Sequence, residues 1–364
     1  MRKTKALIIA ALMAASLAGC SGTTTPEATT APPATTETAA AETATEETTE
    51  EETTEEEMSS EAATLADGPV VRIGSLKGPT SMGLVHLMDP TADIWKPNYD
   101  FTMVAAADEL LGKVASGDLD IALIPANVSS VLYNKTQAGI SVIDINTLGV
   151  LYIVSSDDSI QEFADLKGRT IAMTGKGNTP EYVMNYLLSA NGLSTDDVTL
   201  EFKSEAAEVA AILKEQPDVV GMLPQPFVTV ATTQNEDLKI LFDCTAEWEA
   251  VQGESGSQLV TGVTVVRNEF LEANKDLVEA FIADHQASTL YTETNPERTA
   301  DLIAQAGIIE KAPIAQKALP YCNIVCITGD DMKSALTGYL EVLFEQDPSS
   351  VGGTLPADDF YYLP

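Results

Sequence analysis

Residues 121–130 read IALIPANVSS, and residues 220–229 read VGMLPQPFVT. Each stretch is an apolar run that ends in a proline, followed by polar residues and a segment with helical spacing. A short apolar run closed by a proline is typical of a buried strand. The two stretches therefore predict the same junction twice, at which a strand gives way to a helix.

The spacing upstream of each junction is also the same. From Val71 to Pro125 is as far as from Thr170 to Pro224, and in both intervals apolar runs alternate with helical runs. Equal spacing indicates an internal duplication of a βαβαβ unit. Alternation of this kind predicts a mostly parallel sheet with helices on its faces. The expected strands are residues 70–74, 101–106, 120–125, 141–145 and 150–154, then 170–175, 198–202, 218–224 and 238–244.

The rest of the chain is expected to return to the first lobe. After Cys244 come a polar stretch, one more expected strand at 260–266, and amphipathic helical runs at 276–292 and 329–346. We therefore expect an α/β protein of two lobes, each a mostly parallel sheet flanked by helices, joined by a two-stranded hinge. The hinge is expected near residues 148–155 and 243–259, with lobe 1 at 68–150 and 246–364 and lobe 2 at 151–245.

Residues 1–20 have the layout of a secretory signal: basic residues, an apolar run, and small residues that end at Cys20. The run is too short for a membrane span. Its last four residues, LAGC, resemble the lipobox of bacterial lipoproteins, which implies that Cys20 is lipidated and anchors the chain to the outer face of the cytoplasmic membrane.

Residues 21–67 are mostly Thr, Glu, Ala and Pro and lack material for a core. We expect them to form a disordered tether, as suits a Gram-positive cell surface.

The composition excludes several classes of function. The formal net charge is −35, which disfavours nucleic acid and anionic lipid headgroups as partners. The two histidines, His86 and His285, lie in expected helices far apart in sequence. Cys244, Cys322 and Cys326 match no zinc spacing, and we expect buried thiols at all three positions. We therefore expect no catalytic residues, no metal and no cofactor.

Motifs in a fixed order resemble a known family. They include GPTSMGL at 78–84, PANVSSVLYNK at 125–135, LPQPFVT at 223–229 and PYCNIVCITGDDMK at 320–333. Together they resemble the substrate-binding lipoproteins of ABC importers, in the branch that binds nitrate, sulfonates, bicarbonate and thiamine precursors. The resemblance implies a type II periplasmic-binding-protein fold. It also implies that the solute is held between two lobes and passed to a membrane permease driven by an ATPase.

In open α/β sheets, ligands bind beyond the carboxyl ends of the strands, where helix N-termini present N–H groups and a partial positive charge. Each junction residue could instead be an ordinary helix cap or a surface residue. Similar polar loops at the strand ends of both duplicated units favour a binding cleft. The expected ligand contacts are Lys77, Gly78, Pro79, Thr80, Ser81, Asn127, Tyr152, Thr174, Lys176, Gly177, Asn178, Thr179, Gln225 and Pro226.

The sequence thus predicts a monomeric, non-catalytic receptor that captures a small organic anion or heterocycle for an ABC importer. Lys77 and Lys176 favour an anion, whereas aromatic side chains such as Tyr152 favour a flat ring, and the residues leave this choice open. The alternatives are an enzyme of the thiamine-pyrimidine synthase type on the same fold, or a surface sensor for a signalling partner. The synthases resemble this chain in architecture but use a cysteine-rich motif and an active-site histidine.

Overall fold

The computed structural model describes residues 68–92, 97–252 and 257–364. The expected signal peptide, the lipidated Cys20 and the tether lie outside the described residues. Within the described ranges, no helix has the length and apolar character needed to cross a bilayer.

The first sheet has six strands in the order β11-β4-β10-β3-β1-β2. Strands β2 and β3 pair in parallel with β1, whereas β10 runs antiparallel to both β3 and β4. Strand β11 runs antiparallel to β4. Four strands therefore share one direction, and the sheet is mixed. The strand bounds are Val71–Leu76 (β1), Tyr99–Val104 (β2), Ile121–Pro125 (β3), Ile140–Leu148 (β4), Val260–Arg267 (β10) and Ile324–Ile327 (β11).

The second sheet has five strands in the order β7-β6-β8-β5-β9. Strand β6 pairs in parallel with β7 and β8, and β5 is antiparallel to β8 and β9. The order β7-β6-β8 repeats the order β2-β1-β3, so the duplication read from the spacing is also a repeat of topology. The strand bounds are Leu151–Ser155 (β5), Thr170–Met173 (β6), Thr199–Phe202 (β7), Val220–Pro224 (β8) and Lys239–Asp243 (β9).

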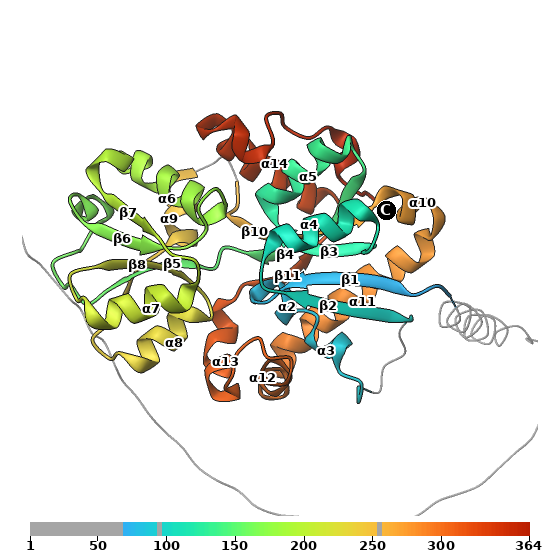
Figure 1. The fold of residues 1–364 in the computed structure, drawn as a ribbon, viewed down its shortest axis with the longest axis horizontal. Helices are drawn as coiled ribbons and strands as arrows, with labels where there is room; N and C mark the ends of the chain where they lie inside the picture. Colours follow the sequence, from blue (N-terminus) through green and yellow to red (C-terminus); the bar gives the residue numbers. More distant parts are fainter. Residues whose placement is uncertain (1–67, 93–96, 253–256) are drawn as a thin grey trace, which may run out of the picture. The chain divides into compact units, whose positions relative to one another are not determined.

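Helices cover both faces of each sheet (Figure 1). In the first sheet, α4 and α5 lie on one face and α2, α3 and α11 on the other; in the second, α6 and α9 lie opposite α7 and α8. The α/β fold with two helix-flanked sheets is the one predicted. The helix bounds are Pro79–Met82 (α2), Val85–Met88 (α3), Ala107–Ser116 (α4), Ala126–Thr136 (α5), Thr179–Ala190 (α6), Ala206–Glu215 (α7), Phe227–Gln234 (α8), Cys244–Gln252 (α9), Asn268–Ala273 (α10), Lys275–Thr294 (α11), Pro296–Gln305 (α12), Ala312–Ala318 (α13) and Gly329–Gln346 (α14).

The chain passes between the sheets twice. The first passage is the short step from β4 to β5. The second passage begins with α9, in a stretch that was predicted only to be polar. Trp248 of α9 is fully buried, with its ring 4.6 Å from that of Tyr186 and 5.7 Å from that of Tyr339. The helix has only two buried residues, Cys244 and Trp248, so its sequence has too few apolar positions to show a helical period.

A buried carboxylate ties three strands of the first sheet together. Asp120, immediately before β3, is 1% exposed. It accepts hydrogen bonds from Arg72 Nε at 2.8 Å and Nη2 at 2.6 Å, from the Arg72 backbone N–H at 3.0 Å, and from Arg267 Nη2 at 3.2 Å. Burial alone would raise the pKa of Asp120, but the hydrogen bonds from Arg72 and Arg267 and the charge of Arg72 outweigh it, so the pKa lies below the ordinary carboxyl value.

Helix α14 contacts elements of both sheets, because it packs against β4 and β10 of the first and against α6, which belongs with the second. Its Tyr339 is fully buried. The Tyr339 hydroxyl donates to Thr179 Oγ1 at 3.1 Å. Since Thr179 begins α6, the C-terminal helix fixes the loop that follows β6 relative to the first sheet.

Candidate ligand-binding site

A cavity of about 180 Å³ lies where the carboxyl ends of strands from both sheets meet. Four prolines give its wall a twofold repeat. Pro79 and Pro180 lie in the first turns of α2 and α6, and Pro125 and Pro224 end β3 and β8. The lining residues are Leu76, Lys77, Gly78, Pro79, Thr80, Pro125, Val150, Leu151, Asn178, Thr179, Pro180, Pro224 and Thr261.

The loop after β1 supplies the first side of the cavity. Gly78 has φ 153°, a value that side chains other than glycine's rarely allow. Thr80 donates from Oγ1 to Leu76 O at 3.1 Å and lines the cavity. Ser81 is turned inward, with no exposed surface, and donates to Ser75 Oγ at 2.7 Å. Ser81 therefore holds the loop, while Lys77 to Thr80 face the cavity.

The loop after β6 supplies the opposite side. Gly175 and Gly177 have φ values of 80° and 72°, and the Gly177 N–H donates to Glu181 Oε2 at 2.6 Å. This geometry brings Asn178 and Thr179 to the cavity wall. Thr174 is half-buried before the turn and is not among the lining residues. Gly177 is exposed and likewise does not line the cavity.

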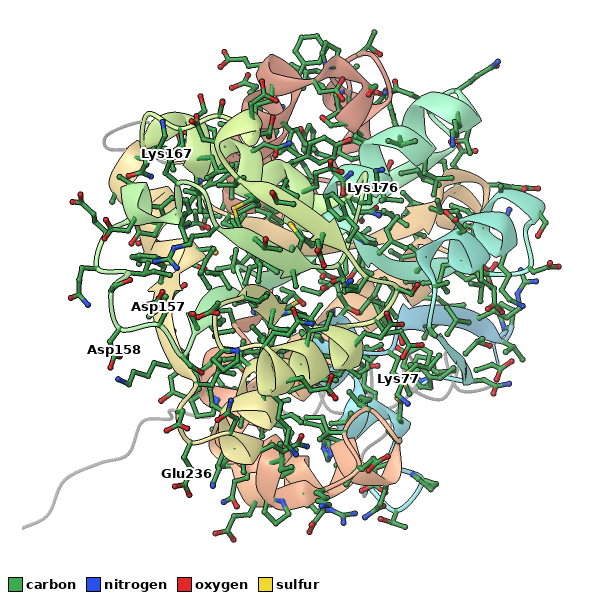
Figure 2. The ribbon with its side chains drawn as sticks, turned by 60° about the vertical axis from the view of Figure 1, so that its left-hand side comes forward. Lys77, Asp157, Asp158, Lys167, Lys176 and Glu236 are labelled. Carbon is green, nitrogen blue, oxygen red and sulfur yellow. The ribbon has the colours of Figure 1, made fainter. Side chains whose placement is uncertain are left out.

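The two lysines expected to contact ligand are placed differently. Lys77 is exposed and also lines the cavity. Lys176 is exposed, and its Nζ lies 5.7 Å from the centre of the Phe202 ring. Figure 2 shows the two lysines well apart, on different loops. Among the lining residues, Lys77 is the one cation and no side chain is acidic.

Asn127 connects the two sides without lining the cavity. The residue is 1% exposed. Its Oδ1 accepts from Thr179 Oγ1 at 3.3 Å, and its Nδ2 donates to Ser350 O at 3.2 Å. Thr179 therefore has Asn127 of α5 and Tyr339 of α14 as hydrogen-bond partners. This network positions the N-terminal residue of α6 at the cavity.

Three other expected contacts lie behind the wall. Gln225 accepts on Oε1 from Thr229 Oγ1 at 2.9 Å, and its backbone N–H donates to Val150 O at 2.8 Å. The Gln225–Pro226 peptide bond is cis, and Pro226 is buried. Tyr152 is 5% exposed, and its hydroxyl donates to Tyr321 O at 3.4 Å. Burial raises the pKa of Tyr152, as does the charge of Asp243.

Thr261 lines the cavity but was not among the ligand contacts expected from the sequence. It lies in β10, next to Gly262, which pairs with Pro125. Its Oγ1 is buried and has no hydrogen-bond partner within the described residues. A buried hydroxyl of this kind normally finds a partner, so Thr261 Oγ1 is an exception beside the cavity wall. Only the return of β10 beside β3, far along the chain, brings it here.

Positive groups lie beside the cavity, and its surface is mostly apolar. Helices α5 and α6 begin at the wall, at Pro125 and Asn178, and within the described residues no side chain caps either N-terminus. Helix N-termini carry about half a positive elementary charge. The cavity surface itself is almost entirely apolar, supplied by the prolines, Leu76, Val150 and Leu151, and Lys77 and these two N-termini are the positive groups beside it.

Cys244, Cys322 and Cys326, the cysteines within the described ranges, lie away from this cavity and form no disulfide there. Cys244 and Cys322 are buried as expected, whereas Cys326 is only partly buried. Burial raises the pKa of the Cys322 thiol to about 12. Neither histidine lines the cavity. The His86 ring stacks on Tyr291 with centroids 3.7 Å apart, and His285 is fully buried against Asp144.

Solved structures with the same fold are numerous. An ABC transporter protein from Parabacteroides distasonis is 21% identical, with a TM-score of 0.69, covering 81% of this chain and 99% of its own. The periplasmic aliphatic sulphonate binding protein SsuA from Escherichia coli is 16% identical, with a TM-score of 0.65, covering 82% and 93%. The alkanesulfonate-binding protein SsuA from Xanthomonas axonopodis pv. citri, bound to MOPS, is 17% identical, with a TM-score of 0.58, covering 80% and 96%. The fold is thus that of type II periplasmic binding proteins.

No curated protein matches the sequence significantly. The family model described as NMT1/THI5 like matches residues 101–299. This region runs from β2 into α12 and includes Thr179, Thr261 and the two prolines that end β3 and β8. The chain therefore belongs to the NMT1/THI5-like family.

Proposed function

We propose that this chain is an extracytoplasmic solute-binding protein that delivers a small solute to the permease and ATPase of an ABC importer. The observation that carries the proposal is the cavity at the facing strand ends of the duplicated units, where both units contribute equivalent residues. Ligands of open α/β sheets bind at this edge. The ABC-transporter and sulfonate-binding descriptions of proteins with the same fold agree with it.

The proposed motion is closure of two lobes around the solute. Lobe 1 comprises residues 68–150 and 246–364, and lobe 2 comprises residues 151–245. Gly149 and Val150 lie between β4 and β5 at the first passage, and Val150 also lines the cavity. A hinge of a few terminal residues of packed elements is sufficient for such closure. Lipidation of Cys20 would hold the protein at the outer face of the membrane, near its permease.

The proposed solute is a small organic anion with an apolar body, such as a short sulfonate or carboxylate. Lys77 and the N-termini of α5 and α6 would bind the anionic group. The four prolines, Leu151 and Thr261 would contact the apolar part. A volume of about 180 Å³ fits a molecule of this size.

Mass spectrometry of material released by denaturing the freshly purified protein tests this function. A small anion is expected, and isothermal calorimetry should then give a saturable, one-to-one binding curve with it. A panel of short alkanesulfonates, carboxylates and pyrimidines should be titrated in parallel. Absence of saturable binding across the panel, with no released solute, would contradict the receptor function.

Replacing Lys77 by Met is expected to weaken binding of the anion about tenfold or more, since a hydrogen bond to a charged group contributes about 1.5–3 kcal/mol. The matched change Lys176→Met removes the same charge from a side chain over Phe202 and should leave affinity within about twofold. Calorimetry on both variants measures the difference. Equal affinities for the two would instead favour a neutral ring as the solute.

Replacing Asn127 by Ala is expected to lower the affinity about fivefold, because Thr179 loses the acceptor that positions it, a loss of about 1 kcal/mol. Asn134→Ala is the matched control. Asn134 lies on the same helix and its Nδ2 also bonds to the C-terminal segment, donating to Val351 O at 2.9 Å. Equal losses in the two variants would show that α5 acts only through its contact with the C-terminal segment.

The family description also includes THI5-type proteins, so a pyrimidine synthase is the second function to test. Such an enzyme needs reactive groups at its ligand. The His86 ring stacks on Tyr291, and His285 is bonded to Asp144, so neither contributes to the cavity wall. Absorbance of bound pyridoxal phosphate in the purified protein would favour the synthase. An adjacent sensor-kinase gene in place of permease genes would favour a surface sensor.

A further inference from the structure

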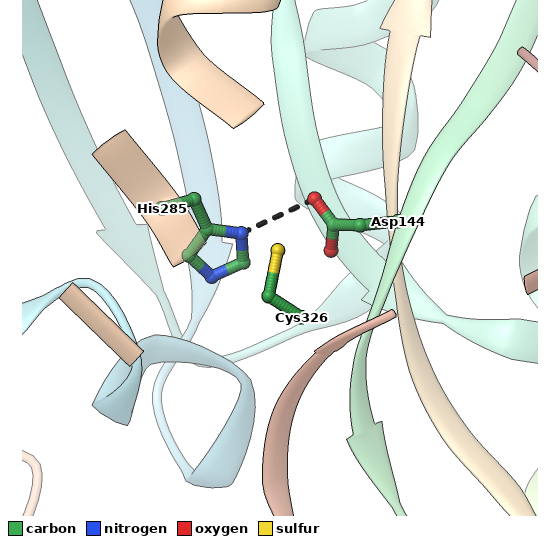
Figure 3. Close-up of side chains that lie close together, drawn as sticks. All are labelled: Asp144, His285 and Cys326. Carbon is green, nitrogen blue, oxygen red and sulfur yellow. Dashed lines mark hydrogen bonds and ion pairs between the residues drawn. The ribbon is translucent and has the colours of Figure 1, made fainter. Parts of the chain in front are cut away.

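Three side chains from distant parts of the chain converge beneath the first sheet: Asp144 of β4, His285 of α11 and Cys326 of β11. One ligand atom of each lies within 4.8 Å of the others. Asp144 and His285 are fully buried, and Cys326 is partly buried. Figure 3 shows the three side chains pointing toward one another. The cluster is separate from the cavity described above.

We propose that Asp144, His285 and Cys326 form a binding site for a divalent transition metal of the zinc class. A carboxylate, an imidazole and a thiolate are the ligand set that Zn²⁺ and Co²⁺ prefer. The proposal is independent of the solute-binding function, because it concerns a different part of the molecule.

The arrangement of the three side chains fits metal coordination better than it fits a catalytic nucleophile with its general base. In a Cys-His-Asp relay the two ring nitrogens face different partners. Here His285 Nδ1 lies 3.1 Å from Asp144 Oδ2, and Cys326 approaches the same side of the ring in Figure 3. Two ligands about 2.0–2.1 Å from a tetrahedral zinc ion lie about 3.4 Å apart, so the observed separation needs only a small adjustment.

The surrounding contacts support the ligand roles. Thr264 Oγ1 donates to Asp144 Oδ1 at 2.7 Å, which leaves Oδ2 for the metal and orients the carboxylate. His285 Nε2 is buried and has no hydrogen-bond partner within the described residues, as is also true of Thr289 Oγ1. Both atoms face Gly83: a Cβ built there would lie 3.3 Å from Nε2 and 3.1 Å from Oγ1. A metal on Nδ1 places the ring proton on Nε2, on the side of Gly83 and Thr289.

Charge balance also favours a cation. A bound M²⁺ would be neutralised by the Asp144 carboxylate and the Cys326 thiolate, with His285 neutral, so no net charge would be buried. On binding, bonds form from Oδ2, Nδ1 and Sγ to the metal. The thiol proton is released to solvent, and the imidazole proton moves from Nδ1 to Nε2.

The test is to unfold the full chain in denaturant, remove any metal with a chelator, and then refold the chain with Co²⁺ or Zn²⁺. About one metal should remain per chain after gel filtration, and the Co²⁺ form should show a thiolate-to-cobalt charge-transfer band. Cys326→Ser should lose that band and lower metal retention about tenfold or more. Cys322→Ser removes a buried thiol without this ligand set and should behave like the parent chain.

Two outcomes would overturn the metal site. One is a parent chain that refolds but retains no metal. The other is equal metal retention and an unchanged spectrum in Cys326→Ser, which would place the ion among the many acidic residues elsewhere. A His285→Gln variant would also remove a ligand, but it could fail to fold. The melting temperature of the parent chain and the two cysteine variants therefore provides the second measurement. Added Zn²⁺ should raise it in the parent chain and in Cys322→Ser but not in Cys326→Ser.

Discussion

Replacing Thr261 by Phe is expected to abolish solute binding while the protein stays folded. Thr261 lines a cavity of only about 180 Å³, and its Oγ1 has no partner to lose within the described residues. A phenyl ring directed into this space would occupy the volume of a small solute. We expect the affinity measured by calorimetry to fall at least about 100-fold, equivalent to about 2.7 kcal/mol.

The control is Thr102→Phe, the same exchange on edge strand β2, at a half-buried residue outside the cavity lining. Its affinity should match that of the parent chain. Circular dichroism and thermal melting should show both variants folded. A folded Thr261→Phe protein that still binds the released solute at parental affinity would place the solute outside this cavity and contradict the proposed site.

Replacing Asp120 by Asn is expected to give a large loss of stability. The carboxylate is buried and accepts from Arg72 and Arg267. Removing one member of a buried ion pair leaves the other charge uncompensated, which costs about 3–5 kcal/mol. Arg72 is 38% exposed and is partly screened by solvent, so we expect a loss of about 3 kcal/mol in the free energy of unfolding, measured by urea denaturation.

The effect should depend on pH in a defined direction. The folded-state pKa of Asp120 is lowered, so its ion pairs stabilise the protein above the ordinary carboxyl pKa. That contribution is lost as the pH falls from about 4 through the lower folded value. The difference in stability between the parent chain and Asp120→Asn should therefore be constant near neutral pH and shrink in acid.

Asp158→Asn is the control for this change. Asp158 pairs with Lys239, and both side chains are mostly exposed. Exposed pairs contribute little, so its denaturation midpoint should match that of the parent chain at every pH. Equal stability of Asp120→Asn and the parent chain near neutral pH would show that the buried ion pairs do not stabilise the sheet.

Strand and loop positions were largely predictable because they depend on local sequence. The apolar runs that end at Pro125 and Pro224 became the ends of β3 and β8. The duplicated spacing appeared as the repeated order β2-β1-β3 and β7-β6-β8. Helix α9 was missed because Trp248 stabilises it through contacts with Tyr186 and Tyr339, which are distant in sequence.

The sequence by itself determined where the loops at the strand ends lie, since glycine, proline and hydroxyl residues dictate turns and helix starts. Only the tertiary structure decided which side chains face it. Lys77 lines the cavity and Lys176 does not, although both follow first strands of equivalent units. The return of β10 beside β3 brought Thr261 to the wall, and the pairing of β11 with β4 brought Cys326 to Asp144 and His285. These contacts join residues far apart along the chain, so no local pattern encodes them.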